Sequence, residues 1–161
     1  MAAQHGDESV EGEPLVEEYM RTDVVTIGPE ATVKELAHTF HEEDVSGCPV
    51  VDEEGNLFGI VTEGDLVAQD AELHPPRYIQ FLDSKIYLQS PKKFEERLRK
   101  VTGYTVKDVM TADVLTVTPK TPVRRAATIM ADNRINRLPV VEGRRMVGLI
   151  GRHEVLRAMG Y

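Results

Sequence analysis

The sequence predicts a mixed α/β (α+β) protein built from two pseudo-symmetric β-α-β-β-α repeats with a helical insert between them. Three observations support this prediction. A shift of 90 positions pairs residues 16–52 with residues 106–142 and makes 11 of the 37 pairs identical, where chance gives about two or three. Within each copy the apolar residues follow a strand period and a helix period in the same order. About 40 residues between the copies do not repeat.

The identical pairs mark fixed points of the repeat. They include Met20 with Met110, Asp23 with Asp113, Thr26 with Thr116, Pro29 with Pro119, Val33 with Val123, and the Pro-Val-Val strings at 49–51 and 139–141. After Glu142 the second copy lacks one residue, so Gly59 then aligns with Gly148 and Asp65 with Glu154. A one-residue difference in a surface turn costs little.

Each repeat opens with a short β run that is followed by a helix. The runs cover residues 24–27 and 114–117, and a proline two residues later stops each one because proline has no N–H for a sheet ladder. Thr32 and Glu35 then have the spacing of a capping box, ahead of an apolar stripe: Val33, Leu36, Ala37 and Phe40. The second copy places Pro122 at the first helical position after Thr121 and repeats the stripe: Val123, Ala126, Ala127 and Met130.

Two further β runs are predicted to pair as a hairpin in each copy. They cover residues 45–51 and 57–61 in the first copy, and residues 135–141 and 146–150 in the second. A closing helix then begins at Thr62 or at Gly151. Each copy is therefore expected to contain a small three-stranded sheet, which needs a partner to cover its apolar face.

These elements divide the chain into four segments. Residues 1–14 are predicted to be a disordered acidic tail, because they contain almost no large apolar side chain. Residues 15–70 form the first repeat, residues 71–104 the insert and residues 105–161 the second repeat. In the insert, one helix is predicted from the apolar residues between Tyr78 and Leu88, and another from the start and stop signals at Ser90 and Gly103.

Composition argues against several classes of function. The net charge of −8 disfavours nucleic acid and anionic membrane surfaces as partners, because both are negatively charged. No apolar run approaches the roughly 20 residues needed to span a bilayer. Residues 1–14 lack the features of a secretion signal, and the single cysteine, Cys48, cannot form an internal disulfide. The cytoplasm is the expected compartment.

The repeat length, the order of elements, the Pro-Val-Val strand and the string Gly-x-x-Thr-x-x-Asp at 59–65 together resemble the CBS domain, named after cystathionine beta-synthase. The resemblance covers nearly all of the chain after residue 15, apart from the insert. It implies a regulatory module with two clefts, each able to take an adenosyl ligand: AMP, ADP, ATP or S-adenosylmethionine. It also implies a homodimer and an unidentified regulated protein as partners.

Independently of the family resemblance, the chemistry of Thr62 and Asp65 points to a nucleotide. Where a strand meets a helix, a hydroxyl, a carboxylate and free backbone N–H groups come together, and the helix dipole adds positive potential. The carboxylate is suited to accept from ribose hydroxyls, while the threonine hydroxyl and the N–H groups are suited to donate to phosphate. The same spacing also makes an ordinary helix cap, so the string alone fits both interpretations.

The resemblance carries a set of site residues onto this chain. The cleft built on Thr62 and Asp65 is expected to hold the nucleotide, with adenine between apolar walls and arginines at the phosphates: Val24, Thr26, Val45, Ser46, Cys48, Pro49, Ile60, Gly64, Arg134, Arg137, Arg152 and His153. For the apolar members, core packing is the other interpretation. In the second copy Gly151 replaces the threonine and Glu154 the aspartate, so that cleft is expected to be weak or empty; its candidates are Val114, Thr116, Ile135, Asn136, Pro139 and Glu154.

Other residue patterns are weaker. His38, His41 and Glu42 share a predicted helix, but no second cluster completes a tetrahedral metal set, so neither a metal nor a cofactor is predicted. Cys48 precedes a proline in a predicted strand and is interpreted as a small buried hydrophobe. The sequence lacks a phosphate-binding Gly-rich loop, a nucleophile elbow and a zinc-protease motif, which predicts no enzyme activity. The alternative to a sensor is a purely structural dimerisation module without ligand.

The homodimer is expected to form through the outer helices of the two copies. The candidate contact residues are 36–40, 126–130 and those from Leu66 onward, with the apolar residues of the insert as an extension. A two-fold contact of this kind uses one surface twice, as most soluble oligomers do.

Overall fold

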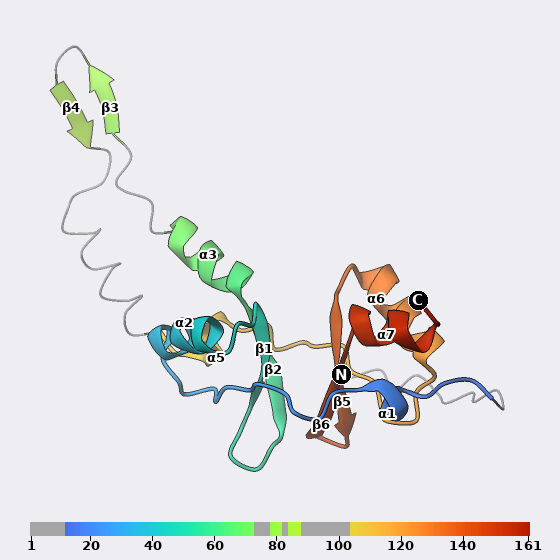
Figure 1. Cartoon of the computed structure of the whole chain (residues 1–161). Coiled ribbons are helices and arrows are strands. Elements are labelled where there is room, and N and C mark those ends of the chain that lie inside the picture. The colour runs from blue at the N-terminus through green and yellow to red at the C-terminus, as the bar shows by residue number, and fades with distance from the viewer. Residues whose placement is uncertain (1–11, 73–77, 82–83, 88–103) are drawn as a thin grey trace. The chain divides into compact units, whose positions relative to one another are not determined.

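The protein has a mixed α+β fold in which the chain divides into two compact units (Figure 1). A computed structural model describes residues 12–72, 78–81, 84–87 and 104–161, and the side chains of residues 12–67 and 104–161. Unit 1 comprises Met1–Thr26, Val51–Phe58 and Asp113–Tyr161, and unit 2 comprises Ile27–Val50 and Gly59–Ala112. Each unit therefore combines segments of both repeats.

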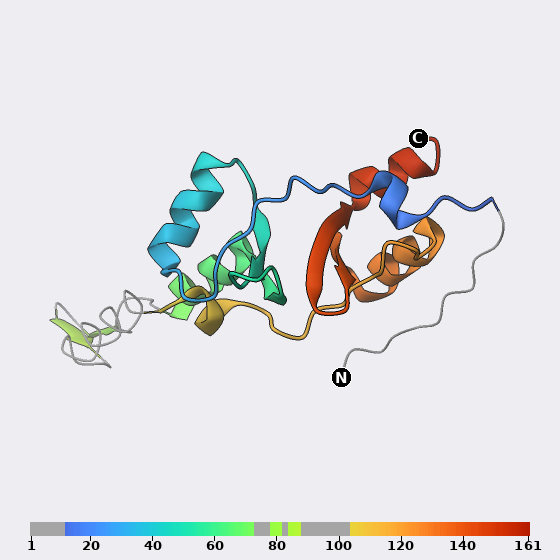
Figure 2. The same cartoon turned by 90° about the horizontal axis from the view of Figure 1, so that it is seen from below.

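Unit 1 is built around the hairpin and helices of the second repeat. Its elements are α1 (Val16–Tyr19), α6 (Val123–Asn133), β5 (Arg137–Glu142), β6 (Arg145–Gly151) and α7 (Arg152–Ala158). Strands β5 and β6 pair antiparallel, with a register shift between Val140 and Val141. Helix α7 contacts both α6 and α1, and Figure 2 shows α1 beside α7. Pro122, predicted as the first helical residue, is instead the N-cap of α6, so the helix begins one position later, at Val123.

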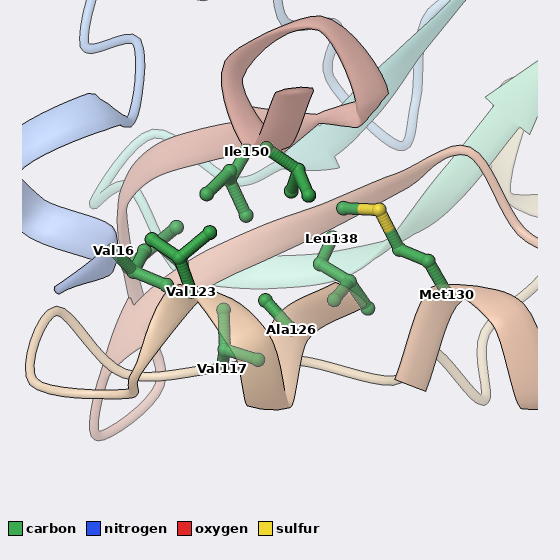
Figure 3. Close-up of a cluster of buried hydrophobic side chains, with 9 residues drawn as sticks. Val16, Val117, Val123, Ala126, Met130, Leu138 and Ile150 are labelled. Carbon is green, nitrogen blue, oxygen red and sulfur yellow. The ribbon is translucent and has the colours of Figure 1, made fainter. Parts of the chain in front are cut away.

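The core of unit 1 joins residues from both repeats. Figure 3 shows Val16 of α1 in one cluster with Val123 and Ala126 of α6 and with residues of the hairpin, and all of these side chains are buried: Val16, Val117, Val123, Ala126, Met130, Leu138 and Ile150. The apolar stripe predicted for residues 123–130 thus faces the core, except that Ala127 is only partly buried. Burying apolar surface is the main driving force of folding, so this cluster holds α1 to the second repeat.

Unit 2 repeats this plan with the first repeat. Its elements are α2 (Val33–Glu42), β1 (Gly47–Val51), β2 (Leu57–Thr62), α3 (Glu63–Glu72) and α5 (Val106–Val109). Strands β1 and β2 pair with one another, and their last and first residues, 51 and 57–58, belong to unit 1. The capping box of α2 is confirmed: Thr32 Oγ1 accepts the Glu35 N–H at 3.1 Å, and Glu35 Oε2 accepts the Thr32 N–H at 2.7 Å. Leu36 and Phe40 of α2 are buried, as the stripe predicts, whereas Val33 is half-buried and Ala37 is exposed.

The short helix α1 belongs to the first repeat in sequence but binds to the second. The Val16 N–H donates to the Thr121 carbonyl and the Glu17 N–H donates to the Pro119 carbonyl, both at 2.9 Å. Further along, the N–H of Arg21 bonds to the Leu149 carbonyl at 2.9 Å. Neither the helix nor its exchange was predicted from the sequence.

Helix α5 makes the reciprocal exchange in unit 2. The Val106 N–H donates to the Ala31 carbonyl at 2.8 Å, and the Lys107 N–H donates to the Pro29 carbonyl at 3.0 Å. These positions lie 90 residues from their counterparts in unit 1, so the two exchanges are pseudo-symmetric. Each unit is completed only by the helix that the other repeat supplies.

The predicted three-stranded sheets are wrong. The runs 24–27 and 114–117 each make one parallel bridge, Ile27 to Val50 and Val117 to Val140, and both sheets have two strands. Proline residues explain why each of these runs makes one bridge and does not become a third strand. To extend the parallel pairing on either side of the bridge between Val117 and Val140, the N–H groups of residues 139 and 119 would have to donate hydrogen bonds. Both residues are proline and have none, and Pro49 and Pro29 impose the same limit in unit 2.

The helix predicted between Tyr78 and Leu88 is also wrong. Strands β3 (Tyr78–Phe81) and β4 (Ser84–Tyr87) form an antiparallel hairpin instead, with Ile79 opposite Ile86. Short apolar runs fit the helical and the strand period equally, and aromatic and β-branched residues favour the strand. The helix predicted from Ser90 and the tail over residues 1–11 lie outside the described residues.

Candidate functional site

The candidate site centres on the junction between β2 and α3. Asp65 Oδ2 accepts the Thr62 N–H at 2.7 Å and the Thr62 hydroxyl at 3.1 Å, and both residues are half-buried. Among the described residues, no donor bonds to the second carboxylate oxygen, Oδ1. The carboxylate is thus fixed by one oxygen while the other is available at the first turn of the helix.

The contact between Thr62 and Asp65 is also an ordinary helix cap. Asp108 Oδ2 accepts the Thr105 N–H at 2.8 Å and the Thr105 hydroxyl at 2.9 Å, ahead of α5. These bonds hold the pKa of the Asp108 carboxyl below its usual value, the backbone N–H having the larger effect. Because α5 shows the same geometry, the cap by itself does not distinguish a ligand site.

Three neighbours in unit 2 shape the junction. The Ser46 carbonyl accepts the Glu63 N–H at 2.9 Å, which ties the residues before β1 to the start of α3. Ile60 is half-buried, and its N–H and carbonyl pair with those of Thr111 at 3.0 and 2.9 Å. A Cβ on Gly64 would stand 3.4 Å from Thr62 Oγ1, so glycine leaves the space beside that hydroxyl open.

The remaining candidates of unit 2 lie on the approach to β1 or within it. Val45 is half-buried and Ser46 exposed, whereas Cys48 and Pro49 are fully buried in the strand. The side chains of Cys48 and Pro49 belong to the core of unit 2. Cys48 is a buried free thiol, which confirms its interpretation as a small hydrophobe.

The second copy presents its carboxylate differently. Glu154 Oε2 accepts the Gly151 N–H at 2.9 Å, and the residue is only 7% exposed. A Cβ on Gly151 would stand 2.9 Å from that same oxygen. Glu154 therefore occupies the space that a threonine side chain would need, and its carboxylate is turned into the unit. The Asn136 carbonyl accepts the Arg152 N–H at 3.1 Å, as Ser46 does for Glu63.

The other predicted residues belong to unit 1, whereas Thr62 and Asp65 belong to unit 2. Arg137 is the first residue of β5 and half-buried; Arg134 ends α6 with a left-handed backbone (φ 54°). Four more candidates are half-buried: Val24, Val114, Thr116 and Ile135. Five are exposed, namely Thr26, Arg134, Asn136, Arg152 and His153, and Pro139 is buried. That the arginines meet the nucleotide of the Thr62 cleft stays a prediction.

Neither a cluster of metal ligands nor a membrane-spanning helix is present among the described residues. No three side chains of His, Cys, Asp or Glu within them gather as metal ligands do. None of the helices in that part of the chain combines the length and apolarity required to cross a bilayer.

Comparison with known proteins identifies the family. The family model of the CBS domain matches residues 16–72 and residues 106–161, which together make up more than half of the chain. The chain belongs to the CBS domain family. The boundaries of the two CBS repeats enclose α1 to α3 and α5 to α7.

Relatives of this CBS pair occur alone and within larger proteins. The uncharacterised protein MJ1426 of Methanocaldococcus jannaschii is 27% identical, and the match covers 90% of each chain. The inosine-5'-monophosphate dehydrogenase of the same organism is 28% identical over the whole chain, which spans only 27% of that enzyme. The crystal structure of CBSX2 in complex with AMP is 27% identical with a TM-score of 0.69, and the match covers 90% of this chain and 95% of that chain. CBSX2 is a protein of Arabidopsis thaliana.

The groups that the exchanged helices bring to the junction were not predicted from the sequence. Thr111 pairs with Ile60 and directly follows Met110. Met110 and Met20 are an identical pair at matching positions of the two copies. The identity of that pair was a usable signal, because a methionine kept at the same place in both copies indicates one packing role.

Proposed function

We propose that this chain is a regulatory module that binds an adenine nucleotide through Thr62 and Asp65 of the first CBS repeat. The main support for this proposal is the Asp65 carboxylate, which is fixed through Oδ2 while Oδ1 takes no hydrogen bond from a described residue. It lies beside the open backbone of Gly64 at the start of α3. The solved complex of CBSX2 with AMP supports an adenosyl ligand, since CBSX2 shares this fold and 27% of its sequence.

The chemistry of the junction fits a nucleoside phosphate. A carboxylate is an acceptor for the two hydroxyl protons of a ribose. The Thr62 hydroxyl and the N–H groups of the first helical turn are donors for phosphate oxygens, and the positive end of the helix dipole favours the negative charge. AMP, ADP, ATP and S-adenosylmethionine all have the ribose that Asp65 would bind.

The two repeats are unequal in this proposal. The second repeat has no hydroxyl at Gly151, and its carboxylate is buried and bonded to the backbone. Binding a ribose there requires Glu154 to leave its place in unit 1. The chain therefore takes one nucleotide with useful affinity, and the second copy is weak or empty.

The module acts as an energy or metabolite sensor and performs no catalysis of its own. Nucleotide binding changes the arrangement of the repeats or of two chains, and a regulated protein responds to the change. The match within inosine-5'-monophosphate dehydrogenase fits this role, since it covers 27% of that enzyme. A cytoplasmic location stays a prediction from the sequence.

Isothermal titration with AMP, ADP, ATP and S-adenosylmethionine tests the proposal. Asp65→Ala should abolish most of the affinity, and Asp108→Ala is its matched control because Asp108 makes the same two cap bonds at α5. Each substitution removes one cap, so both variants lose the same kind of local stabilisation. The proposal predicts that only Asp65→Ala loses binding. Equal binding by the two variants would show that Thr62 and Asp65 form a cap and nothing more.

A second candidate function is a purely structural dimerisation module. The cap at Thr105 favours it, because that contact exists at a place where no ligand is predicted. A thermal-shift series separates the two functions. A ligand that binds only the folded protein raises its stability by RT ln(1 + [L]/Kd), so a sensor melts at a higher temperature with one of the four nucleotides. A structural module melts at the same temperature with all four.

A further inference from the structure

The first half of helix α3 is less buried than the other helices of the two repeats. Among residues 63–67, none of the side chains is buried, and Val67 is 66% exposed. The corresponding helix of the second repeat, α7, buries Glu154 and Val155. Helices α2 and α6 bury apolar side chains in their own units: Leu36, Phe40, Val123, Ala126 and Met130. The expectation from sequence that Leu36, Phe40 and Met130 meet a second chain is therefore wrong.

The sequence of α3 also gives the helix little stability of its own. Its first turn contains Gly64, a poor helix former, and its last turn has no basic residue to interact with the negative end of the helix dipole. Helix α7 has Arg157 in its last turn, and this side chain donates to the Tyr19 carbonyl at 3.4 Å. A helix of ten residues is marginal in water when packing does not support it. Helix α3 therefore depends strongly on its cap.

The groups that would bind the nucleotide are the groups that begin α3. Asp65 Oδ2 accepts the N–H and the hydroxyl of Thr62, which closes the first turn. The N–H groups of that turn are arranged for a phosphate only while the helix is formed. A nucleotide at this junction therefore binds the formed helix and not the open one. A ligand that binds one of two states shifts the population toward that state.

Helices α3 and α5 hold the two ends of the insert within unit 2. Helix α5 is firmly attached: Val106 and Val109 are buried, and the Val106 N–H donates to the Ala31 carbonyl at 2.8 Å. Thr105 and Asp108 cap it in the same way as Thr62 and Asp65 cap α3. The insert thus has one attachment that is fixed by burial and another, α3, whose order depends on the cap.

We propose that nucleotide binding at Thr62 and Asp65 stabilises α3 against local opening, and that α3 transmits the occupancy of the site to the insert. This inference rests on the proposed function, because it names the element that responds to the ligand. Without nucleotide, α3 opens for part of the time while the remainder of unit 2 stays folded. The bound nucleotide keeps α3 closed and so fixes the second end of the insert.

Hydrogen exchange, measured with and without nucleotide, tests this coupling. Calorimetry with AMP, ADP, ATP and S-adenosylmethionine first selects the ligand, which is then used at about 100 times its Kd. At short exchange times the amides of α3 should exchange about tenfold more slowly or less, since the ligand binds only the closed helix. The amides of α7 should not change. Those of β3 and β4 should slow by about twofold or more, because an insert held at both ends has less entropy to lose on ordering.

Substitution of Val67 tests the same equilibrium through affinity. Alanine and glycine at an exposed helix position differ by about fivefold in the ratio of formed to open helix. Since an open α3 does not bind, Val67→Gly should bind the nucleotide about two- to fivefold more weakly than Val67→Ala. Leu156→Ala and Leu156→Gly are the matched control, because Leu156 is the aligned residue of α7 and is 48% exposed. These two variants should bind equally.

The outcomes separate this inference from the proposed function. Nucleotide binding with unchanged exchange in α3, or with equal slowing in α3 and α7, overturns the inference and leaves the proposed function standing. Equal affinity of Val67→Ala and Val67→Gly also overturns it. Slower exchange in α3 without any change in β3 and β4 overturns the transmission to the insert. A chain that binds none of the four ligands overturns the proposed function and this inference with it.

Discussion

The sulfur of Met110 lies 2.9 Å from the point where a Cβ on Gly59 would stand, and the carbonyl oxygen of Thr111 lies 2.5 Å from it. The second unit repeats this relationship, since the same point on Gly148 lies 2.7 Å from the sulfur of Met20. Each methionine belongs to the segment exchanged from the other repeat. In each unit, therefore, a methionine of the identical pair packs against a glycine of the aligned pair.

The first prediction concerns these glycines. Gly59→Ala and Gly148→Ala should each lower the free energy of unfolding by about 1–3 kcal/mol, the usual cost of overpacking. The reason is that a backbone carbonyl lies within 3 Å of the new methyl group in both places. Gly28→Ala is the control, because nothing lies within 4 Å of its Cβ position. Urea denaturation measures all three, and equal stability of Gly59→Ala and Gly28→Ala would contradict the contact.

The second prediction concerns two ion pairs with reversed charges. Glu17 bonds to Lys120 in unit 1 at 2.5 Å, and Lys107 bonds to Glu30 in unit 2 at 2.8 Å. These are the same two positions of the repeat, since 17 aligns with 107 and 30 with 120. An α1 bound to its own repeat would place Glu17 against Glu30, so the charges favour the exchange over the alternative.

Glu17→Lys and Lys120→Glu should each destabilise unit 1 slightly, by about 0.2–1 kcal/mol for an exposed pair. The double variant should recover most of the loss because the pair is rebuilt in reverse, as it stands in unit 2. A double-mutant cycle by urea denaturation measures the coupling. Losses that simply add in the double variant would show that the two charges do not interact.

The third prediction concerns acid stability. Hydrogen bonds from the side chain and then the backbone N–H of Asn56 lower the pKa of Asp52. A carboxyl with a lowered pKa in the folded state contributes stability above its unfolded pKa and loses it as the pH falls through the folded value. Asp52→Asn should therefore flatten the fall in unfolding free energy below about pH 4. Glu53→Gln in the same turn is the control, and an unchanged slope for Asp52→Asn would contradict the prediction.

The fourth prediction concerns the closed second copy. Gly151→Thr should destabilise the protein, because its new Cβ would stand 2.9 Å from Glu154 Oε2. Adding Glu154→Asp shortens the carboxylate side chain and rebuilds the pattern of Thr62 and Asp65. Thermal unfolding should show that the double variant is more stable than Gly151→Thr alone. If Glu154→Asp fails to relieve the loss, Glu154 is not the group that excludes the threonine.

The fifth prediction concerns Arg137, whose phosphate role comes from the resemblance. Arg137→Ala should weaken ATP and ADP more than adenosine, since a charge-assisted hydrogen bond to phosphate contributes roughly 1.5–3 kcal/mol. Titration calorimetry with the three ligands measures the difference. The same loss for all three would remove Arg137 from the phosphate end of the ligand.

The sequence by itself determined the repeat, the helices α2 and α6, the hairpin of each repeat and the caps at Thr32 and Thr62. These features depend on contacts within a few residues. A capping box joins Thr32 to Glu35 three positions away, and an apolar stripe needs only its own spacing to predict which face of a helix is buried. The cap at Thr62 and the buried state of Cys48 were predictable for the same reason.

Only the tertiary structure decided which repeat each short helix completes, how far the sheets extend and where Glu154 points. Helices α1 and α5 have four residues each and no stripe long enough to predict burial. Their places depend on Thr121 and Ala31, more than 70 positions away. The prolines limit a ladder only through the strand they face, and the Glu154 carboxylate is buried in the space that the missing Cβ of Gly151 leaves. For the short helices and the sheets the deciding group is distant in sequence, and folding brings it into contact.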